Sequence, residues 1–414
     1  MPWYYGWNVL AVGMVFQAIS FGIGIYSFTF WVLPWTREFG VGRGDVMTVY
    51  LAMTVAMGVI SPFAGRAMDS MSIRGLISAG TLCFALALAL TAYASELWQI
   101  AMIYGVLVPI GMVMAGPLSA QTLAAKWFSA RRGMAIGIVT IGTSLGGLLI
   151  PPLVTMLQSS MGWRDANLVL AVLVLVAILP PVWLVVRNTP EELGLAGDVG
   201  TQPPSARTDA KVEYPQWTTK SILSARIFWV MICAFVPMAL AFGAAQQNLA
   251  PYAADHGFDT QATAFLVSLM ALVMIGAKVF FGAMADRWSH RLLFMTALVS
   301  LAASLSLMRG AVSYDQLTLM VILLGFAAGA FLPLMGAIVS SWFGAAAFGR
   351  VTGLVGPFTT LAAIGPWIAG YIRDTTGSYD PAWFWLSISL LIAVAATLML
   401  GGRPDFAQNN QARG

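Results

Sequence analysis

Long apolar segments alternate with short polar ones along the whole chain. Most of the apolar segments have about the 20 residues that a helix needs to cross the hydrocarbon core of a membrane. Helices are predicted rather than barrel strands, because a backbone in lipid must satisfy its own hydrogen bonds and these segments lack the alternation of barrel strands. The twelve predicted spans are residues 8–33, 46–64, 76–94, 98–123, 133–157, 166–186, 227–249, 261–283, 292–308, 316–342, 350–371 and 382–400. The pattern therefore predicts an all-α membrane protein with twelve transmembrane helices.

The composition is typical of the same class. Of the 414 residues, 59% are hydrophobic and only 9% are charged, whereas soluble domains carry about 25% charged residues. This excludes water-soluble, disordered and disulfide-scaffold proteins. The two cysteines, Cys83 and Cys233, lie within apolar spans, and the sequence contains no phosphate loop, metal-ligand cluster or nucleophile triad. We therefore predict that the protein is not an enzyme and holds no cofactor or metal.

Basic residues gather on one side of the predicted spans. Fifteen of the 21 Lys and Arg residues fall on the side of both termini and the middle loop, and five fall on the opposite side. By the positive-inside rule, both termini are predicted to be cytoplasmic. The net charge of +4 follows from this topology, so the lipid bilayer is the expected partner and nucleic acid is not. The one remaining basic residue, Lys278, lies inside the eighth span.

The two halves of the chain resemble each other. The segment GRAMD at residues 65–69 recurs as GAMAD at residues 282–286, at the end of the corresponding span. Internal repeats around a central path are typical of secondary transporters. The predicted domains are a first six-helix bundle over residues 1–187, a cytoplasmic linker over 188–225, a second six-helix bundle over 226–402 and a cytoplasmic tail over 403–414.

The repeated segment resembles the cytoplasmic loop signature of the major facilitator superfamily, G-x-L-a-D-r-x-G-r-r. The first copy is GRAMDSMSIR and departs from the signature at Ser70 and Ser72; the second is GAMADRWSHR. The resemblance implies two pseudo-symmetric six-helix bundles that transport by alternating access. It also implies that the glycines let helices approach, while the aspartates accept hydrogen bonds from a helix N-terminus and an arginine. The alternative is simple loop solvation. The expected latch residues are Gly65, Asp69, Arg74, Gly282, Asp286 and Arg287.

Four further segments resemble bacterial members of the monocarboxylate transporter group and the related oxalate/formate antiporters. They are YGWNVLAVGMVF, LPWTREFGVGRGDV, KWFSARRGMAIGI and RNTPEELGL. The resemblance implies a small carboxylate as cargo, carried with protons or in exchange for another anion. It also implies a protein of the bacterial inner membrane, and we expect it to function as a monomer.

Lys278 independently favours an anionic cargo. A cation deep in a span costs about 2.5–3.5 kcal/mol on the insertion scale, so it is seldom placed there without a partner or a water-filled cavity. In the resembling transporters an arginine of span eight binds the substrate carboxylate, and its pattern A-R-x-x-x-G-x-x-A aligns with residues 277–285 here. Lysine keeps the charge but loses the planar, two-pronged grip of arginine. Two alternatives are that Lys278 snorkels to the interface, or pairs with helix dipoles or carbonyls.

Polar residues in other spans could complete a substrate site, because spans one, four, seven and ten line the path in the resembling family. The candidates are Gln17, Tyr26, Thr29, Gln121, Gln247 and Asn248. Each could hydrogen-bond a carboxylate, and each could equally bridge helices. Asp255 and His256 are the candidates for proton coupling, with loop solvation as the alternative. Lys278 could also titrate, and anion exchange would need no titrating group.

Two other functions remain open. A drug or cation efflux carrier of the same fold would normally carry an acidic residue inside a span, and this sequence has none well inside one. A receptor or enzyme on the same scaffold would need a reactive constellation or a large soluble domain, and the linker over 188–225 supplies neither.

Overall fold

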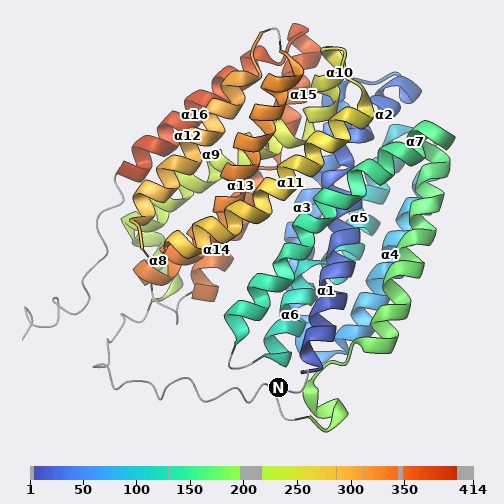
Figure 1. The fold of residues 1–414 in the computed structure, drawn as a ribbon, viewed down its shortest axis with the longest axis vertical. Helices are drawn as coiled ribbons and strands as arrows, with labels where there is room; N and C mark the ends of the chain where they lie inside the picture. The colour runs from blue at the N-terminus through green and yellow to red at the C-terminus, as the bar shows by residue number, and fades with distance from the viewer. Residues whose placement is uncertain are drawn as a thin grey trace, which may run out of the picture. The chain divides into compact units, whose positions relative to one another are not determined.

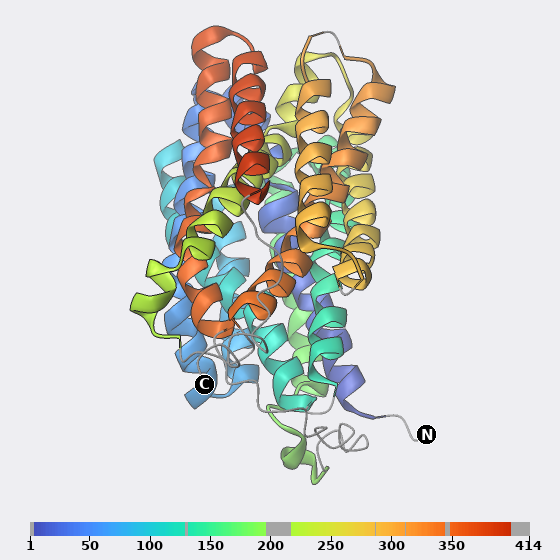
Figure 2. The ribbon, with the colours of Figure 1, turned by 90° about the vertical axis from the view of Figure 1, so that its left-hand side faces the viewer.

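The structure is a computed structural model that describes residues 4–128, 131–195, 217–285, 287–310, 312–343 and 348–398. The secondary structure of these residues is helical throughout (Figure 1, Figure 2). In the first half the helices are α1 (Gly6–Phe21), α2 (Val32–Phe39), α3 (Arg43–Ser70), α4 (Ile73–Ala92), α5 (Leu97–Met114), α6 (Pro117–Trp127) and α7 (Arg132–Val185). In the second half they are α9 (Arg226–Gln247), α10 (Leu249–Asp255), α11 (Thr260–Ala285), α12 (His290–Leu307), α13 (Tyr314–Phe343), α14 (Phe348–Leu361), α15 (Ile364–Thr376) and α16 (Asp380–Leu398).

These helices confirm the predicted all-α class. Ten helices of the described residues are long and apolar enough to cross a membrane. Spans five and six both lie in α7, which is interrupted at Gly162, where φ is +82°. Span eleven is divided between α14 and α15. Of the predicted linker, residues 190–193 form a short 3-10 turn and Thr219–Ser224 form α8, while 196–216 lie outside the described residues, as does the predicted tail.

Contacts divide the chain into two units, each drawn from both halves of the sequence. Unit 1 contains Met1–Pro203, Gln246–Leu272 and Pro366–Ser378, and unit 2 contains Pro204–Ala245, Val273–Gly365 and Tyr379–Gly414. Unit 1 therefore includes α10, most of α15 and the first part of α11 together with the whole first half. Unit 2 holds the remainder of the second half.

Glycines let α1 and α7 pack together within unit 1. A Cβ added at Gly142 would lie 2.8 Å from the Cα of Met14, and one added at Gly146 would lie 2.9 Å from the backbone N of Gly22. Both distances are well inside the 3.5–4.0 Å of ordinary carbon contacts, so a side chain at either position would push the helices apart. The spacing of four residues is that of the small-xxx-small pattern of membrane helix pairs.

Unit 2 has its own close contact beside the predicted substrate lysine. A Cβ added at Gly329 of α13 would collide with the backbone O of Met274, 2.8 Å away, and with the side chain of Ala277 on α11. The small residue at 329 thus allows α13 to lie directly against α11, next to Lys278. Aromatic rings fill the adjoining core, where Phe281 contacts Phe326 at 4.9 Å between centroids.

Candidate functional site

The first span loses regular α-helical geometry near three polar residues, Tyr26, Ser27 and Thr29. After α1, residues Gly22–Tyr26 form a π-helical turn (η1) and Phe28–Phe30 form a 3-10 turn (η2). Ser27 lies between them and closes the first turn, because its Oγ donates to the Gly22 carbonyl at 2.8 Å. Turns of the π type often mark functional positions in helices. The sequence signal is the pair Gly22 and Gly24, which the apolar pattern alone did not single out.

Tyr26 belongs to a buried group of hydroxyl and amide side chains in unit 1. Its hydroxyl interacts with Ser144 of α7, and its ring lies against Gly147, where an added Cβ would be 2.7 Å from a ring carbon. The hydroxyl of Tyr50 on α3 interacts with the side chain of Gln247, whose Nε2 also donates to the Ile25 carbonyl at 3.2 Å. We call Tyr26, Tyr50, Ser144 and Gln247 the polar cluster. Sequence analysis had not singled out Tyr50 or Ser144.

Other predicted site residues of unit 1 bond to the backbone of neighbouring helices. Gln17 is fully buried, and its Nε2 donates to the Val139 carbonyl at 2.5 Å. Asn248 is fully buried and donates from Nδ2 to the Pro366 carbonyl at 3.1 Å. The Oγ1 of Thr29 accepts a hydrogen bond from the backbone N–H of Ala250 at 2.9 Å. Gln121 is partly buried in α6.

Lys278 lies in the part of α11 that belongs to unit 2 and is partly buried. Seven residues are about two helical turns, so Lys278 lies on the same face of α11 as Ala271. Ala271 is fully buried, and its Cβ lies 2.9 Å from the position that a Cβ on Gly147 would take.

The two copies of the loop signature are only partly described. The side chain of Asp69 and the whole of Asp286 lie outside the described residues. Arg74 places its guanidinium over the Trp183 ring, 4.8 Å from the centroid, and Arg287 is exposed. A Cβ added at Gly65 or Gly282 would meet no described atom within 4 Å. The close helix approach expected at these two glycines is therefore not made by the residues described here.

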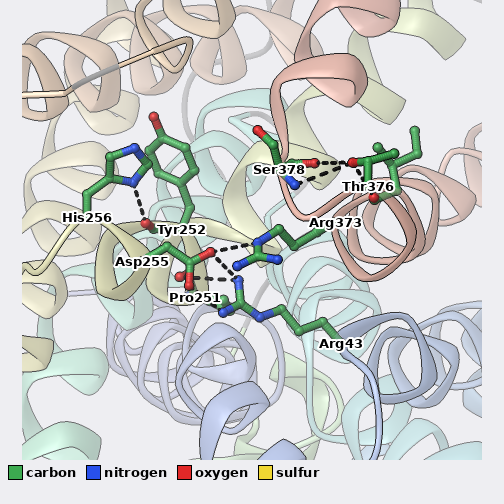
Figure 3. Close-up of polar contacts among 9 residues, drawn as sticks. Arg43, Pro251, Tyr252, Asp255, His256, Arg373, Thr376 and Ser378 are labelled. Atoms are coloured by element: carbon green, nitrogen blue, oxygen red, sulfur yellow. Dashed lines mark hydrogen bonds and ion pairs between the residues drawn. The ribbon is translucent and has the colours of Figure 1, made fainter.

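Asp255 is the centre of an ion-pair group that the sequence did not reveal (Figure 3). Its Oδ1 lies 2.6 Å from Arg43 Nη2, and its Oδ2 lies 2.8 Å from Arg43 Nη1 and 2.9 Å from Arg373 Nε. The three side chains are 21%, 12% and 27% exposed, respectively. Burial raises the pKa of Asp255, but the hydrogen bonds and charges of the two arginines outweigh it and hold the pKa below the usual carboxyl value. We call Arg43, Asp255 and Arg373 the Asp255 cluster.

His256 is oriented by its own helix. Its Nδ1 lies 2.9 Å from the Tyr252 carbonyl oxygen, which can only accept, so Nδ1 carries the proton (Figure 3). The imidazole and the Tyr252 ring are in contact, with centroids 4.4 Å apart. Neither Asp255 nor His256 is therefore a simply solvated loop residue.

A cavity of about 540 Å³ adjoins this region within unit 1. Residues from η2, α2, α7, α10, α11 and the segment between α10 and α11 line it, among them Thr29, Arg37, Gln158, Ala254, Asp259 and Gln261. The Oγ1 of Thr155 donates to Gln261 Oε1 at 2.7 Å across one wall. The lining is thus mixed polar and apolar.

Long apolar helices, repeated halves and buried polar groups within the spans define a membrane transporter. The profile of the Major Facilitator Superfamily matches residues 10–313 and 250–414. The chain belongs to the Major Facilitator Superfamily, as its repeated loop segment predicted.

Similar proteins include human monocarboxylate transporters. The chain is 24% identical to monocarboxylate transporter 11 of Homo sapiens, covering 94% of this chain and 81% of the relative. It is 25% identical to monocarboxylate transporter 2 of Homo sapiens, covering 96% and 85%. An uncharacterized MFS-type transporter of Bacillus subtilis (strain 168), YcxA, is 28% identical over 42% of each chain. The expected resemblance to the monocarboxylate transporter group is thereby confirmed.

A solved structure shares the fold. The bacterial homolog of the human lysosomal transporter Spinster, in an inward-facing and occupied conformation, matches with a TM-score of 0.72 at 14% identity. The match covers 96% of this chain and 97% of that chain. The chain therefore has the major facilitator fold, with two six-helix halves.

Proposed function

We propose that the protein is a secondary active transporter that moves a small organic anion of the monocarboxylate type across the bacterial inner membrane by alternating access. The similarity to monocarboxylate transporters over nearly the whole chain supports this cargo class. In the proposed topology both termini are cytoplasmic, as the distribution of basic residues indicates.

The observation that carries the proposal is Lys278, the one basic residue of the sequence that lies away from the ends of a predicted apolar span. It lies in α11 and is partly buried. Gly329 leaves room for α13 beside Lys278 and places no bulky side chain there. A cation in this setting attracts an anion more strongly than in water, because the surrounding medium has a low dielectric constant.

The polar cluster supports hydrogen bonding as the second element of recognition. Tyr26 and Tyr50 present hydroxyl groups that can donate to a carboxylate, and Gln247 presents amide hydrogens. We propose Tyr26, Gln247 and Asn248, with Thr29, Gln121 and Gln17, as the polar residues that bind substrate together with Lys278.

The experiment that tests the proposal is uptake of labelled carboxylates into proteoliposomes by Lys278→Gln and Lys278→Arg. Glutamine removes the charge at similar length, so uptake is expected to be abolished while expression and folding persist. Arginine keeps the charge, so uptake is expected to be retained. Lys220→Gln is the matched control, because Lys220 is exposed in α8, outside the spans.

Unchanged uptake by Lys278→Gln would refute the assignment of this lysine. The cargo is identified first by a thermal-shift screen of the purified protein against small mono- and dicarboxylates. A screen in which only organic cations stabilise the protein would instead establish the efflux alternative.

Coupling is proposed to occur by proton symport or by anion exchange. Arg43 and Arg373 lower the pKa of Asp255, which favours exchange or another proton carrier over Asp255. Accumulation driven by a pH gradient across vesicles, without a counter-anion inside, would establish symport. We also propose that the loop-signature residues Gly65, Asp69, Arg74, Gly282, Asp286 and Arg287 latch the cytoplasmic helix ends in one state of the cycle.

A further inference from the structure

The Asp255 cluster joins the two halves of the sequence. Arg43 is the first residue of α3 in the first half, whereas Asp255 ends α10 and Arg373 lies near the end of α15, both in the second half. Arg43 contacts both oxygens of the Asp255 carboxylate, at 2.6 and 2.8 Å. This two-pronged contact is the geometry by which arginine recognises carboxylates in general. The Arg43 guanidinium is thus a carboxylate site that a side chain of the protein occupies (Figure 3).

The backbones beside the cluster are in close contact as well. The backbone N–H of Gly44 donates to Asp374 Oδ2 at 2.7 Å. A Cβ added at Gly370 of α15 would lie 3.1 Å from the Gly44 nitrogen and 3.2 Å from the Arg43 carbonyl carbon. These distances are shorter than ordinary contacts, so the backbones at the start of α3 and in α15 are closely packed.

The contact between the halves continues toward the middle of the helices. Thr29 accepts from the Ala250 N–H at 2.9 Å, and Ser268 of α11 donates to the Leu148 carbonyl of α7 at 2.7 Å. All of these groups belong to unit 1. The cluster lies between spans one and two, seven and eight, and eleven and twelve, on the side that the topology predicts to be periplasmic.

Separation of the halves on this side would divide the cluster unequally. Asp255 and Arg373 both belong to the second half, so their ion pair at 2.9 Å can persist. Arg43 belongs to the first half and would lose Asp255. After opening, the guanidinium of Arg43 is accessible to an anion that enters from this side.

We propose that Arg43 is a carboxylate-binding residue at the periplasmic mouth of the transport path. Asp255 occupies its guanidinium while the mouth is closed, and the carboxylate of the incoming anion takes that place when the mouth opens. The inference rests on the proposed function, because alternating access is what requires the halves to separate on this side. It assigns Asp255 to the gate rather than to proton transfer.

The first experiment measures opening of the mouth by cysteine labelling. The parent protein for this test carries Cys83→Ser, Cys233→Ser and Ala271→Cys, because Ala271 is fully buried between α11 and α7 in the closed arrangement. A membrane-impermeant maleimide is added outside right-side-out vesicles. Adding Asp255→Asn or Arg43→Gln is expected to raise the labelling rate about fivefold, which corresponds to about 1 kcal/mol of closing free energy.

Glu38→Gln is the matched control. The pair Arg164 to Glu38, at 2.7 Å, lies on the same predicted side but within the first half. Separation of the halves leaves this pair intact, so its loss is expected to leave the labelling rate at the parent value. If Asp255→Asn does not fold, Arg43→Lys takes its place in this experiment, because lysine keeps the positive charge but cannot make the two-pronged contact with the carboxylate.

The second experiment measures how Arg43 and Asp255 compete. Uptake is followed as a function of the external concentration of a transported carboxylate. Asp255→Asn removes the competing carboxylate, so the half-saturating concentration is expected to fall about fivefold. Arg43→Gln removes the site itself, so the half-saturating concentration is expected to rise, and Glu38→Gln is expected to leave it unchanged.

The possible failures are distinguishable because labelling requires no transported ligand. Equal labelling of Asp255→Asn and the parent, together with normal uptake, refutes the gate. Faster labelling with an unchanged or higher half-saturating concentration in Asp255→Asn refutes carboxylate binding by Arg43. Absence of carboxylate uptake by the protein with its unaltered sequence refutes the proposed function itself.

Discussion

Gly146 provides a direct test of the packing of the first half. Replacing it with alanine adds a Cβ whose nearest neighbour would be the Ala18 carbonyl oxygen, with the Ala18 carbonyl carbon and the Gly22 nitrogen each 2.9 Å away. Contacts between carbon atoms are normally 3.5–4.0 Å, so α1 and α7 would have to separate by roughly 1 Å. The atoms in the way belong to the backbone, which cannot rotate aside as a side chain can.

The cost can be estimated from overpacking in other cores. One extra methyl group in a close-packed interface destabilises by about 1–3 kcal/mol. Alanine recovers about 0.5–1 kcal/mol through its higher helix propensity than glycine. The expected net loss for Gly146→Ala is therefore between about 0 and 2.5 kcal/mol and centred near 1 kcal/mol, or a few degrees in melting temperature for a unit of this size.

The assay compares two glycines of the same helix. Gly137 also lies in α7, but a Cβ added there meets no described atom within 4 Å, so Gly137→Ala gains the propensity term without the collision. Melting of both variants in detergent is followed by intrinsic fluorescence. The same melting temperature in both variants would show that the close contact of α1 and α7 does not limit stability.

Two further predictions concern the polar side chains. Tyr26→Phe removes the hydroxyl that interacts with Ser144, and the half-saturating substrate concentration is expected to rise about fivefold. The control is Tyr104→Phe, in the aromatic core beside Phe28 and Trp35, which is expected to leave uptake unchanged. Equal effects of the two substitutions would refute a role for the Tyr26 hydroxyl in substrate binding. The second prediction concerns pH, because Arg43 and Arg373 lower the pKa of Asp255 in the folded protein. The ion pairs therefore contribute fully to the stability of the closed arrangement above the ordinary carboxyl pKa of 3.8. They are lost only as the pH falls through the lower pKa of the folded protein. Both proteins carry Ala271→Cys, and the labelling rate of Asp255→Asn divided by that of the parent is therefore expected to stay constant from about pH 5 to 8. A ratio that approaches one as the pH falls toward 5 would instead show that Asp255 takes up a proton in that range.

The helices could be predicted from the sequence because lipid imposes a simple rule. A span must be long, apolar and hydrogen-bonded within itself, so hydropathy alone located the segments that became α3, α4, α9, α11 and α12. The irregular elements follow from local chemistry that hydropathy does not measure. The π turn over Gly22–Tyr26 and the division of span eleven into α14 and α15 are both of this kind.

The site could be predicted only in part, because its contacts join residues far apart in the sequence. Lys278 was evident because a charge in an apolar span conflicts with its surroundings. Tyr50 has no such conflict, since a tyrosine fits an apolar pattern whether or not its hydroxyl has a partner. The sequence indicated Asp255, beside His256, as a candidate for proton coupling, but Arg43 precedes it by 212 residues, and neither local pattern nor the repeat predicts that pairing.

The minority of basic residues on the predicted periplasmic side can now be assigned individual contacts. The positive-inside rule explains why arginine is rare there, but leaves open why five remain. Two bind Asp255, and Arg164 pairs with Glu38 at 2.7 Å. Arg309 lies over the Phe384 ring, 5.2 Å from the centroid, and Arg37 lines the cavity of about 540 Å³.

These contacts separate two roles for a cation on that side. Arg164 and Arg309 contact partners from their own half of the sequence, which a separation of the halves would leave intact. Among the residues that the structure describes, Arg43 alone of the five pairs with a carboxylate from the opposite half of the sequence. Arg43 is thus a basic residue on the side where the positive-inside rule makes basic residues rare, and its carboxylate partner lies in the opposite half. This is what a gate for anions requires, since opening exposes one positive charge where the cargo enters.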